Sequence, residues 1–282
     1  MTAVVETIKE VRDHVSRWRR EGKKVGFVPT MGAFHAGHLS LMAQARKECE
    51  AVVVSIFVNP LQFAAGEDYD RYPRQLAKDL KMAESERADV MFCPSVAEIY
   101  PKGFSTHVIQ EKTSLPSKLC GQFRPDHFQG VMTVVAKLFS IVKPHAAYFG
   151  QKDYQQYLIV RRLTIDLNLD VDVKLMPTVR EEDGLAMSSR NIYLGPKQRK
   201  DATCLSRSLK KAEDMVSAGE SSATKVSGEM RRLIQRVKGA RVDYIAIVNS
   251  ETLEPVKEIK GKTLVALAVR IGKARLIDNT LL

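Results

Sequence analysis

Short apolar runs alternate with segments of helix length over the first part of the chain. Between residues 24 and 178 the runs are KVGFVPT, AVVVSIFVNP, ADVMFCPS, AAYFG and VDVKLMPT. This alternation predicts parallel strands joined by crossover helices. The run AVVVSIFV is apolar on both faces, which is typical of a parallel strand covered by helices on each side. We therefore expect it to lie in the centre of the sheet.

The pattern changes after Pro177. A polar loop comes first, followed by two expected helices at 197–217 and 222–238 and by the strand runs DYIAIVN, TLVALAVR and ARLIDN. Consecutive strands with no helix between them predict a small antiparallel sheet. At the other end of the chain, residues 1–18 read as one amphipathic helix. The fold class is therefore α/β, with a parallel-sheet domain at 1–177 and a smaller α+β domain at 178–282.

Composition narrows the class of protein. With 44% hydrophobic and 27% charged residues, the chain resembles an ordinary globular enzyme. No apolar run approaches the roughly 18 residues of a membrane helix, so we expect no membrane association. The N-terminus lacks the apolar region of a signal peptide, which predicts a cytoplasmic location.

The net charge of +11 raises the question of nucleic-acid binding. Residues 197–241 hold twelve Lys or Arg and five Asp or Glu, so this stretch supplies seven of the eleven positive charges. No aromatic residues are interleaved with these charges for base stacking. The pattern therefore favours a solvated basic face, or a field that attracts anionic substrates, over a nucleic-acid site.

The segment VPTMGAFHAGH, residues 28–38, follows a strand and opens a helix. Open α/β sheets bind ligands at such turns, where helix N-terminal amides favour anions. Gly32 and Gly37 allow the backbone to approach a nucleotide closely. His35 and His38 are three residues apart, so they can converge on one ligand and donate hydrogen bonds to phosphate oxygens. A lone HxGH is equally typical of capping or core histidines, but the strand, the TxG turn and HxGH together indicate a phosphate site.

Two further segments carry cations for phosphate. In FGQKDYQQ, residues 149–156, Lys152 can act as a compact positive charge, and Asp153 can cap a helix or contact ribose. The segment MSSRN, residues 187–191, resembles the KMSKS loop of the HIGH-motif nucleotidyltransferase superfamily but lacks both lysines. Arg190 is the only strong cation in that loop, so Lys152 and Arg190 must divide the work on the phosphates.

The run SIFVNPLQF places Gln62 just beyond the end of the central strand, where side chains face the ligand crevice. A glutamine offers donors and acceptors without charge. With Gln156, it could bracket the hydroxyls and carboxylate of a small polar acid. Taken singly, each glutamine reads as ordinary surface.

Six motifs occur together: PTMGAFHAGH, FVNPLQF, DYDRYPR, RPDHFQGVMTVV, FGQKDYQQ and MSSRN. Their combination resembles the pantothenate synthetase family over essentially the whole chain. The resemblance implies a Rossmann-like nucleotide- and pantoate-binding domain with a C-terminal lid domain. It implies the ligase of pantothenate biosynthesis, which condenses (R)-pantoate with β-alanine through a pantoyl adenylate and releases AMP and pyrophosphate from ATP. It also implies a homodimer and Mg²⁺ on the ATP phosphates, with protein ligands unassigned.

The resemblance also assigns site residues. Catalysis would rest on His35, His38, Lys152 and Arg190. ATP would contact Pro29, Thr30, Met31, Gly32, His35, Gly37, His38, Gly150, Gln151, Lys152, Asp153, Val179, Met187, Ser188, Ser189 and Arg190. Pantoate and β-alanine would be held by Gln62 and Gln156. His38 is the family's assigned proton donor, although a carboxylate nucleophile and a pyrophosphate leaving group also suit purely electrostatic stabilisation.

The residue at position 151 departs from the pattern of the family. The family usually has an acidic residue at the position of Gln151, which matters little if mainly backbone faces the nucleotide there.

The segment from Glu181 to Asn191 is polar, contains Gly184 and joins the two expected domains. We predict that it is a mobile lid that nucleotide orders.

Three alternatives remain at this stage. A cofactor adenylyltransferase shares HxGH but gives no reason for the paired glutamines. A tRNA synthetase needs an anticodon-reading module, for which the residues after Pro177 leave little room. A nucleic-acid-binding protein would explain the basic helices but leave HAGH and GQKD without a role.

Overall fold

The computed structural model describes residues 1–64, 66–111 and 115–282. By their contacts, these residues form two compact units. Unit 1 comprises Met1–Pro116, Arg124–Gly150 and Gln155–Pro177, and unit 2 comprises Ser117–Phe123, Gln151–Tyr154 and Thr178–Leu282. The main division lies between Pro177 and Thr178, where the sequence predicts a boundary. Two short segments that this boundary assigns to the first domain group with unit 2 instead.

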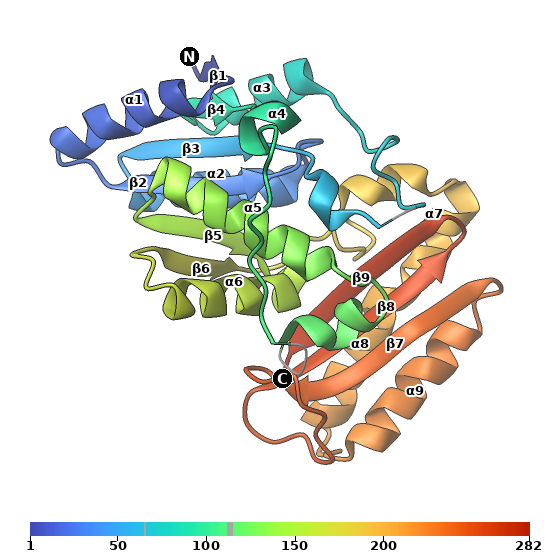
Figure 1. Cartoon of the computed structure of the whole chain (residues 1–282). Helices are drawn as coiled ribbons and strands as arrows, with labels where there is room; N and C mark the ends of the chain where they lie inside the picture. Colours follow the sequence, from blue (N-terminus) through green and yellow to red (C-terminus); the bar gives the residue numbers. More distant parts are fainter. Residues whose placement is uncertain (65, 112–114) are drawn as a thin grey trace. The chain divides into compact units, whose positions relative to one another are not determined.

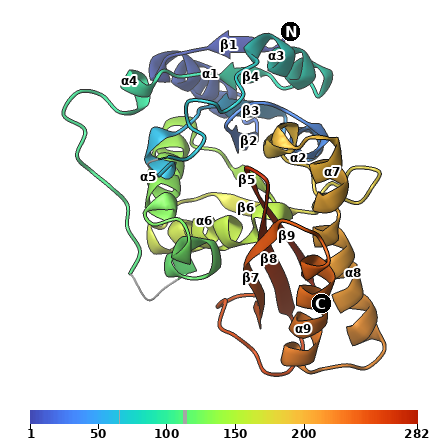
Figure 2. The ribbon, with the colours of Figure 1, turned by 90° about the vertical axis from the view of Figure 1, so that its right-hand side faces the viewer.

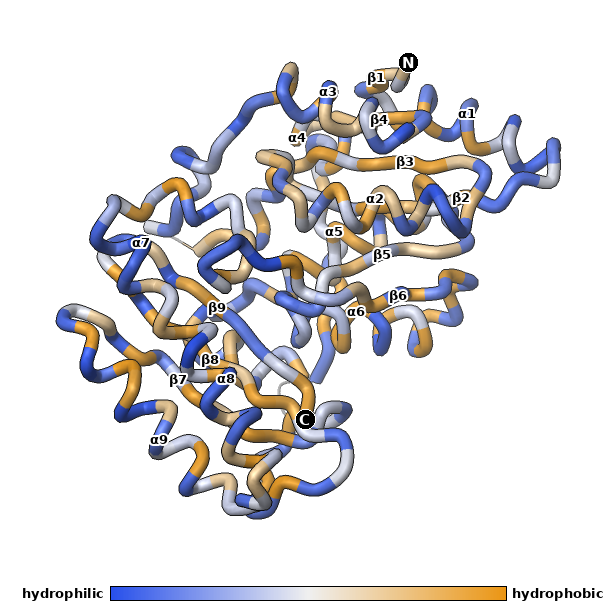
Figure 3. Tube along the Cα trace, turned by 180° about the vertical axis from the view of Figure 1, so that it is seen from behind, coloured by the Kyte–Doolittle hydropathy of each residue, from blue (hydrophilic) through white to orange (hydrophobic). Residues whose placement is uncertain are grey.

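Within the described residues, the core of unit 1 is a six-stranded sheet with every pairing parallel and the order β1-β4-β3-β2-β5-β6 (Figure 1). Strand β3 lies inside the sheet between β4 and β2, and its residues from Ala51 to Ser55 are buried. This confirms the central strand predicted from its apolar faces, and Figure 3 shows β3 as largely hydrophobic. The strands are β1 (Ala3–Val5), β2 (Val25–Thr30), β3 (Ala51–Ile56), β4 (Val90–Phe92), β5 (Ala146–Gly150) and β6 (Asp172–Met176).

Helices cover both faces of this sheet. Figure 2 shows α5 and α6 on one face and α2 on the other. The chain passes from β2 through α2 to β3 on one side, and from β5 through α6 to β6 on the other, so the strand order reverses between β2 and β5. The helices of unit 1 are α1 (Ile8–Arg20), α2 (Ala36–Glu48), α3 (Leu76–Ser85), α4 (Val96–Ile99), α5 (His127–Val142) and α6 (Tyr154–Asp166).

The N-terminus differs from the single helix predicted for residues 1–18. The first residues form β1, in which Val4 pairs with Met91 of β4 at the edge of the sheet. The helix begins only at Ile8, because Thr7 and Glu10 form a capping box there. Amphipathic periodicity does not reveal a three-residue edge strand, whose partner lies far away in the sequence.

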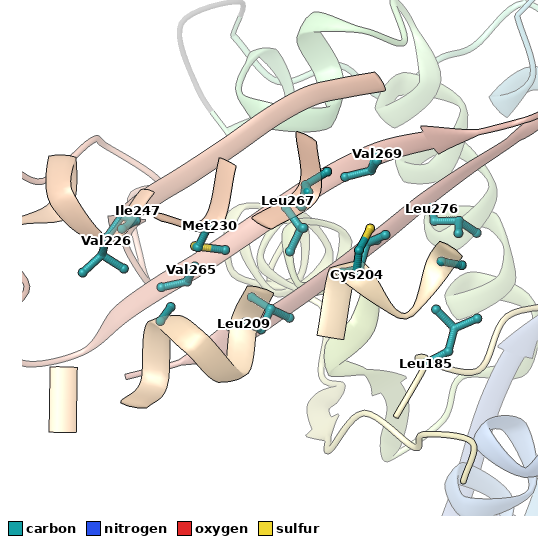
Figure 4. Packing of buried hydrophobic residues seen from close by; sticks show 14 of the residues in the cluster. Leu185, Cys204, Leu209, Val226, Met230, Ile247, Val265, Leu267, Val269 and Leu276 are labelled. Atoms are coloured by element: carbon teal, nitrogen blue, oxygen red, sulfur yellow. The ribbon is translucent and has the colours of Figure 1, made fainter. Parts of the chain in front are cut away.

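Unit 2 is built on an antiparallel sheet in the order β7-β8-β9, as the consecutive strand runs predicted. Helices α8 and α9 pack on one face of this sheet, and Figure 4 shows Leu209, Met230 and Leu267 meeting in the core between them. The elements are α7 (Pro196–Ala202), α8 (Cys204–Ser217), α9 (Ala223–Gln235), β7 (Ala240–Asn249), β8 (Thr263–Ile271) and β9 (Ala274–Leu281).

The single helix predicted at 197–217 is wrong, because the structure divides it at Thr203 into α7 and α8. The Thr203 hydroxyl donates to the Lys200 carbonyl at 2.8 Å. Such a local side-chain hydrogen bond competes with the helical backbone pattern. The described part of the chain has no helix long and apolar enough to cross a bilayer.

The second face of the unit 2 sheet carries the segment Ser117–Phe123. The Cys120 sulfur lies 3.2 Å from the Tyr244 hydroxyl of β7. The ring of Phe123 lies 6.0 Å from the ring of Tyr244. These contacts explain why a segment from the middle of the sequence groups with the C-terminal sheet.

Candidate active site

Three of the motif segments leave the same edge of the unit 1 sheet. Thr30, the last residue of β2, pairs with Ile56, the last residue of β3. The segments that follow the two strands therefore begin side by side. Gly150 ends β5, the other neighbour of β2. Ligands of open α/β sheets bind at this carboxyl edge, where the strand order reverses.

A buried carboxylate shapes the turn after β2. Asp79 of α3 accepts hydrogen bonds from the backbone N–H groups of Ala33 and Phe34, each at 2.8 Å. Gly32 has φ +80°, and a Cβ there would lie 3.0 Å from Ile56 and 3.1 Å from the Asp79 carboxylate. The turn thus requires glycine for its conformation and is held by Asp79. The sequence offered no motif that could have revealed Asp79.

His35 and His38 stand together at the N-terminus of α2. His35 is the N-cap residue, and its Nδ1 accepts from the N–H of Gly37 at 3.2 Å. The Nδ1 of His38 accepts from the N–H of His35 at 3.4 Å. Because each Nδ1 is an acceptor, the neutral rings carry their protons on Nε2, as hydrogen-bond donors.

The environment of this pair favours an anion. The two ring centroids are 4.1 Å apart. The first turn of α2 contains no acidic residue, so no carboxylate of that turn offsets the positive end of the helix dipole. Two donors and a helix N-terminus together can bind phosphate oxygens. The structure thus brings together the two histidines that the motif singled out.

The second polar group of unit 1 lies after β3. The Nε2 of Gln62 donates to the sulfur of Met31 at 3.1 Å, and its Oε1 accepts from Nδ2 of Asn59 at 3.1 Å. Gln62 is only 9% exposed and Asn59 only 1%. This amide is therefore held in place beside the turn after β2. The structure confirms neither Gln62 nor Met31 as a ligand contact, but it places them next to each other.

The backbone of Gln62 is braced from the start of α5. Its carbonyl oxygen accepts from Nδ1 of His127 at 2.8 Å and from Nη2 of Arg124 at 3.2 Å. Nη1 of Arg124 lies 3.1 Å from Nε2 of His127, and a guanidinium can only donate, so this contact suits the tautomer with its proton on Nδ1. These contacts fix the direction in which Gln62 leaves the sheet.

Arg124 also ties down the segment that follows Gln62. Its Nε and Nη2 donate to the two carboxylate oxygens of Glu67 at 2.7 and 2.6 Å. Burial acts to raise the pKa of Glu67, but the hydrogen bonds and charge of Arg124 outweigh it and hold that pKa below its ordinary value. Glu67 is therefore a charged partner at neutral pH.

The two adjacent glutamines of α6 have different environments. Gln155 is buried, and its Nε2 donates to the carbonyl of Leu115 at 2.8 Å. Gln156 is partly exposed, and no hydrogen bond within the described residues joins it to Gln62. The bracket predicted from the two glutamines stays a prediction. The sequence alone could not have told Gln155, a structural residue, from Gln156.

The GQKD motif crosses from unit 1 to unit 2. Residues Gln151–Asp153 form a short 3-10 helix within unit 2, and Nζ of Lys152 pairs with Oδ2 of Asp153 at 3.0 Å. Nδ2 of Asn279 in β9 donates to the carbonyls of Gln151 and Lys152 at 2.8 and 3.0 Å. The backbone of Lys152 is therefore held by the C-terminal sheet, a contact that the sequence did not reveal.

Gln151 departs from the acidic residue usual in the resembling family, and its own side chain joins this contact. Its Nε2 donates to Oδ1 of Asn279 at 3.4 Å. A carboxylate at this position could not donate, so the amide suits the local arrangement.

The segment after Pro177 is a hairpin. Arg180 and Ala186 pair across it, and the N–H of Met187 donates to the carbonyl of Val179 at 3.0 Å. Arg180 makes two bonds, at 2.7 and 3.0 Å, with the carboxylate of Asp278, which is 2% exposed. The two ends of the predicted lid are thus anchored within unit 2. Ordering of this segment by nucleotide stays a prediction.

Arg190 follows directly from the hairpin. Ser188 caps the short 3-10 helix Ser189–Tyr193, and its hydroxyl accepts from the N–H of Arg190 at 3.3 Å. Nδ2 of Asn191 donates to Oε1 of Glu181 at 2.7 Å and to the carbonyl of Ala186 at 3.1 Å. The predicted residues of the MSSRN motif therefore share one anchored substructure of unit 2.

Magnesium has no dedicated cage among the residues that the structure describes, since no cluster of three or more His, Cys, Asp or Glu side chains occurs there. Magnesium that arrives with ATP is held largely by phosphate oxygens and water, with one or two carboxylates at most. We therefore assign no protein ligand to it.

A model of the pantoate–β-alanine ligase family matches residues 3–281 of this chain. The chain belongs to the pantoate–β-alanine ligase family. Pantothenate synthetases from Thermotoga petrophila and Geobacter sulfurreducens are 54% and 50% identical to it, over 99% of this chain and 99% and 98% of theirs. The family resemblance expected from the six motifs is thereby confirmed.

Solved structures agree with this membership. The pantothenate synthetase of Thermus thermophilus has a TM-score of 0.95 to this chain at 47% identity, over 99% of both chains. A pantoate–β-alanine ligase from Francisella tularensis, complexed with "Beta-gamma ATP" and β-alanine, has a TM-score of 0.83 at 35% identity, over 100% of this chain and 98% of its own. The expected Rossmann-like parallel sheet with a smaller antiparallel sheet is confirmed.

Proposed function

We propose that this ligase condenses (R)-pantoate with β-alanine in two steps. In the first, a carboxylate oxygen of pantoate attacks the α-phosphorus of ATP, and pyrophosphate leaves with the electron pair of the broken P–O bond. In the second, the amine of β-alanine attacks the acyl carbon of pantoyl adenylate. AMP leaves with the former carboxylate oxygen, and the amine loses a proton as the amide forms.

The observation that carries this proposal is the pair of imidazoles at the N-terminus of α2. Nδ1 of both His35 and His38 accepts from the start of the helix, so both rings act through Nε2–H groups. Negative charge grows on the α-phosphate oxygens as the carboxylate attacks, and fixed donors stabilise it without reorganising. The attacking carboxylate needs no general base. His38 therefore acts by donating a hydrogen bond, and no step requires it to lose its proton.

Lys152 and Arg190 supply positive charge for the phosphates. Lys152 is 19% exposed, and its backbone is held by Asn279. A partly desolvated ammonium interacts more strongly with phosphate than one in bulk water. Arg190 takes the second position, with its backbone N–H fixed by Ser188. Asp153 keeps Lys152 paired at 3.0 Å before ATP arrives.

The remaining predicted ATP contacts come from the turn after β2 and from the hairpin after Pro177. The first group is Pro29, Thr30, Met31, Gly32 and Gly37, with Gly150 at the end of β5. The second is Val179, Met187, Ser188 and Ser189, and Gln151 follows Gly150 in the 3-10 helix Gln151–Asp153. Most of these positions offer backbone groups or small side chains, which allow a nucleotide to approach closely.

Gln62 holds pantoate, and Gln156 is its proposed second contact. The Nε2 of Gln62 now donates to a thioether sulfur, which is a weak acceptor. A substrate oxygen in place of the sulfur is a better acceptor, so binding gains a stronger hydrogen bond. Magnesium bound to ATP would neutralise phosphate charge. The cytoplasmic location and the homodimer stay predictions from the sequence, to be measured by cell fractionation and light scattering.

Oxygen transfer tests the proposed chemistry. Pantoate labelled with ¹⁸O in its carboxylate should pass one labelled oxygen to AMP, because the oxygen that attacks phosphorus stays there when the amine attacks carbon. Mass spectrometry of AMP after complete turnover measures this. Unlabelled AMP together with labelled pantothenate would show that pantoate is activated in another way.

A further inference from the structure

Tyr100 reaches the Gln62 region from a separate element of unit 1. It caps the C-terminus of α4, and its hydroxyl donates to Oδ1 of Asn59 at 2.8 Å. Its ring packs against Phe57 at 5.9 Å and Phe104 at 4.7 Å between centroids. Burial raises the pKa of Tyr100, so the hydroxyl keeps its proton and remains a donor.

The orientation of the Asn59 amide is fixed by two backbone groups of opposite polarity. The N–H of Leu61 can only donate, and it lies 3.2 Å from Oδ1. The carbonyl of Gly130 can only accept, and it lies 3.0 Å from Nδ2. The oxygen and nitrogen of the side chain cannot exchange places without breaking both bonds. The hydrogen bond from the Tyr100 hydroxyl to Oδ1 supports the same placement of the oxygen and the nitrogen.

Gly130 makes this arrangement possible. A Cβ on Gly130 would lie 2.2 Å from the carbonyl oxygen of Leu61, a distance that no side chain allows. Only glycine lets α5 approach the segment that follows β3 closely enough for the Gly130 carbonyl to reach Asn59. The motif RPDHFQGV therefore contributes a backbone acceptor to the site.

The fixed orientation of the Asn59 amide also fixes the orientation of the Gln62 amide. The second hydrogen on Nδ2 of Asn59 points to Oε1 of Gln62, at an N···O distance of 3.1 Å. If the Gln62 amide were reversed, two NH₂ groups would face each other there, and Oε1 would face the lone pairs of the Met31 sulfur. A reversed amide would thus lose both bonds.

We propose that Tyr100 is a positioning residue, which acts through Asn59 to make Gln62 present its NH₂ group to pantoate. The inference rests on the proposed function, because it takes Gln62 as the contact for pantoate. A site that presents only donors accepts an oxygen with a free lone pair, such as a carboxylate oxygen. It rejects a group whose hydrogen points at Gln62.

Two substitutions at Gln62 test the polarity. Gln62→Glu keeps an oxygen for Asn59 and replaces the donor by a second oxygen, while Gln62→Ala removes both. We expect Gln62→Glu to bind pantoate roughly 10-fold more weakly than Gln62→Ala. In Gln62→Glu, an oxygen of the substituted side chain would face the carboxylate oxygen of pantoate with no hydrogen between them. Pantoate binding by Gln62→Glu that equals or exceeds that of Gln62→Ala would overturn the inference.

The role of Tyr100 is tested by a double-mutant cycle. Tyr100→Phe keeps the ring packing and removes the hydroxyl, and we expect it to raise KM for pantoate by about 2- to 10-fold with KM for ATP unchanged. In the Gln62→Ala background the same substitution should leave KM for pantoate unchanged, because the amide through which Tyr100 acts on pantoate is absent. Equal effects in both backgrounds, or equal changes in both KM values, would show that Tyr100 is merely structural.

The same assays separate this inference from the proposed function. Thermal unfolding of each variant confirms that it is folded. If the wild-type ligase shows no pantoate-dependent ATP–pyrophosphate exchange, the proposed function is wrong. If the wild type exchanges normally and the two Gln62 variants fail to differ as described, only the polarity inference is wrong.

Discussion

The ring of His38 lies against the ring of His35, with 4.1 Å between centroids, and each uses its Nδ1 to accept from the first turn of α2. The helix start therefore determines both tautomers before any substrate binds. Such preorganisation is the main source of electrostatic catalysis, because the donors need not be aligned during the reaction. The pair also makes the two histidines interdependent, since the backbone N–H of one holds the ring of the other.

Removing one of these rings should slow adenylate formation. We expect His38→Ala to lower the single-turnover rate of the first half-reaction by roughly 10²- to 10³-fold, with a smaller effect on pantoate binding. Rapid quench of labelled ATP measures the rate. His14→Ala, in α1 and outside all six motifs, is the matched control and should leave the rate unchanged. A normal rate in His38→Ala would remove His38 from the phosphate site.

Lys152 should act at the same stage. Lys152→Ala should reduce adenylate formation by roughly 10²- to 10³-fold, because developing phosphoryl charge loses a fixed cation. Lys200→Ala, at an exposed position of α7, controls for the loss of one positive charge from a basic chain. Single-turnover formation of adenylate, followed by addition of β-alanine, measures the two half-reactions separately. Normal adenylate formation with failure only in amine transfer would contradict the role given to Lys152.

The neighbours Gln155 and Gln156 should differ in what they support. Gln155→Ala should lower the free energy of unfolding by about 1 to 3 kcal/mol, because the Leu115 carbonyl loses its partner. Gln156→Ala should leave unfolding nearly unchanged and weaken pantoate binding by roughly 5- to 150-fold. Urea denaturation and calorimetry measure the two quantities. Equal stability losses in both variants would make Gln156 a structural residue as well.

Low pH should weaken the ion pair between Glu67 and Arg124, which supports the backbone of Gln62. The folded-state pKa of Glu67 lies below its ordinary value of 4.5, so its contribution to stability is present above about that pH and is lost as the pH falls through the lower folded value. Glu67→Gln should therefore be less stable than the wild type at pH 7, by about 1 kcal/mol after allowance for solvent screening. The difference should shrink towards pH 3 in thermal unfolding. Glu84→Gln, on the surface of α3, should show no such convergence.

The sequence predicted those parts of the molecule whose signal is local. The apolar run of β3 placed the central strand, and HAGH after a strand placed two histidines at a helix start. What it missed arises from contacts between distant segments. Asp79 holds the turn after β2 from a helix more than forty residues away in the sequence, and no pattern around Asp79 marks that role. Asn279 likewise reaches Lys152 from the end of the chain.

The predicted boundaries of two helices, at 1–18 and 197–217, were wrong for a related reason. The predicted helix divides at the single residue Thr203, and hydrophobic periodicity does not report a break of that length. The short strand β1 needs β4 as a partner, and three residues are too few to show the periodicity of a strand. Arg180 and Asp278 anchor the hairpin after Pro177 through a charge pair that composition could not reveal, while its ordering by nucleotide stays a prediction.

The most direct test of the account is isotope exchange between pyrophosphate and ATP. The purified ligase should exchange labelled pyrophosphate into ATP when pantoate is present, without β-alanine and without RNA, because the adenylate half-reaction is complete and reversible on its own. Exchange should disappear when pantoate is withheld and fall by roughly 10²- to 10³-fold in Lys152→Ala. Exchange that ignores pantoate, or that appears only after tRNA is added, would contradict the assignment.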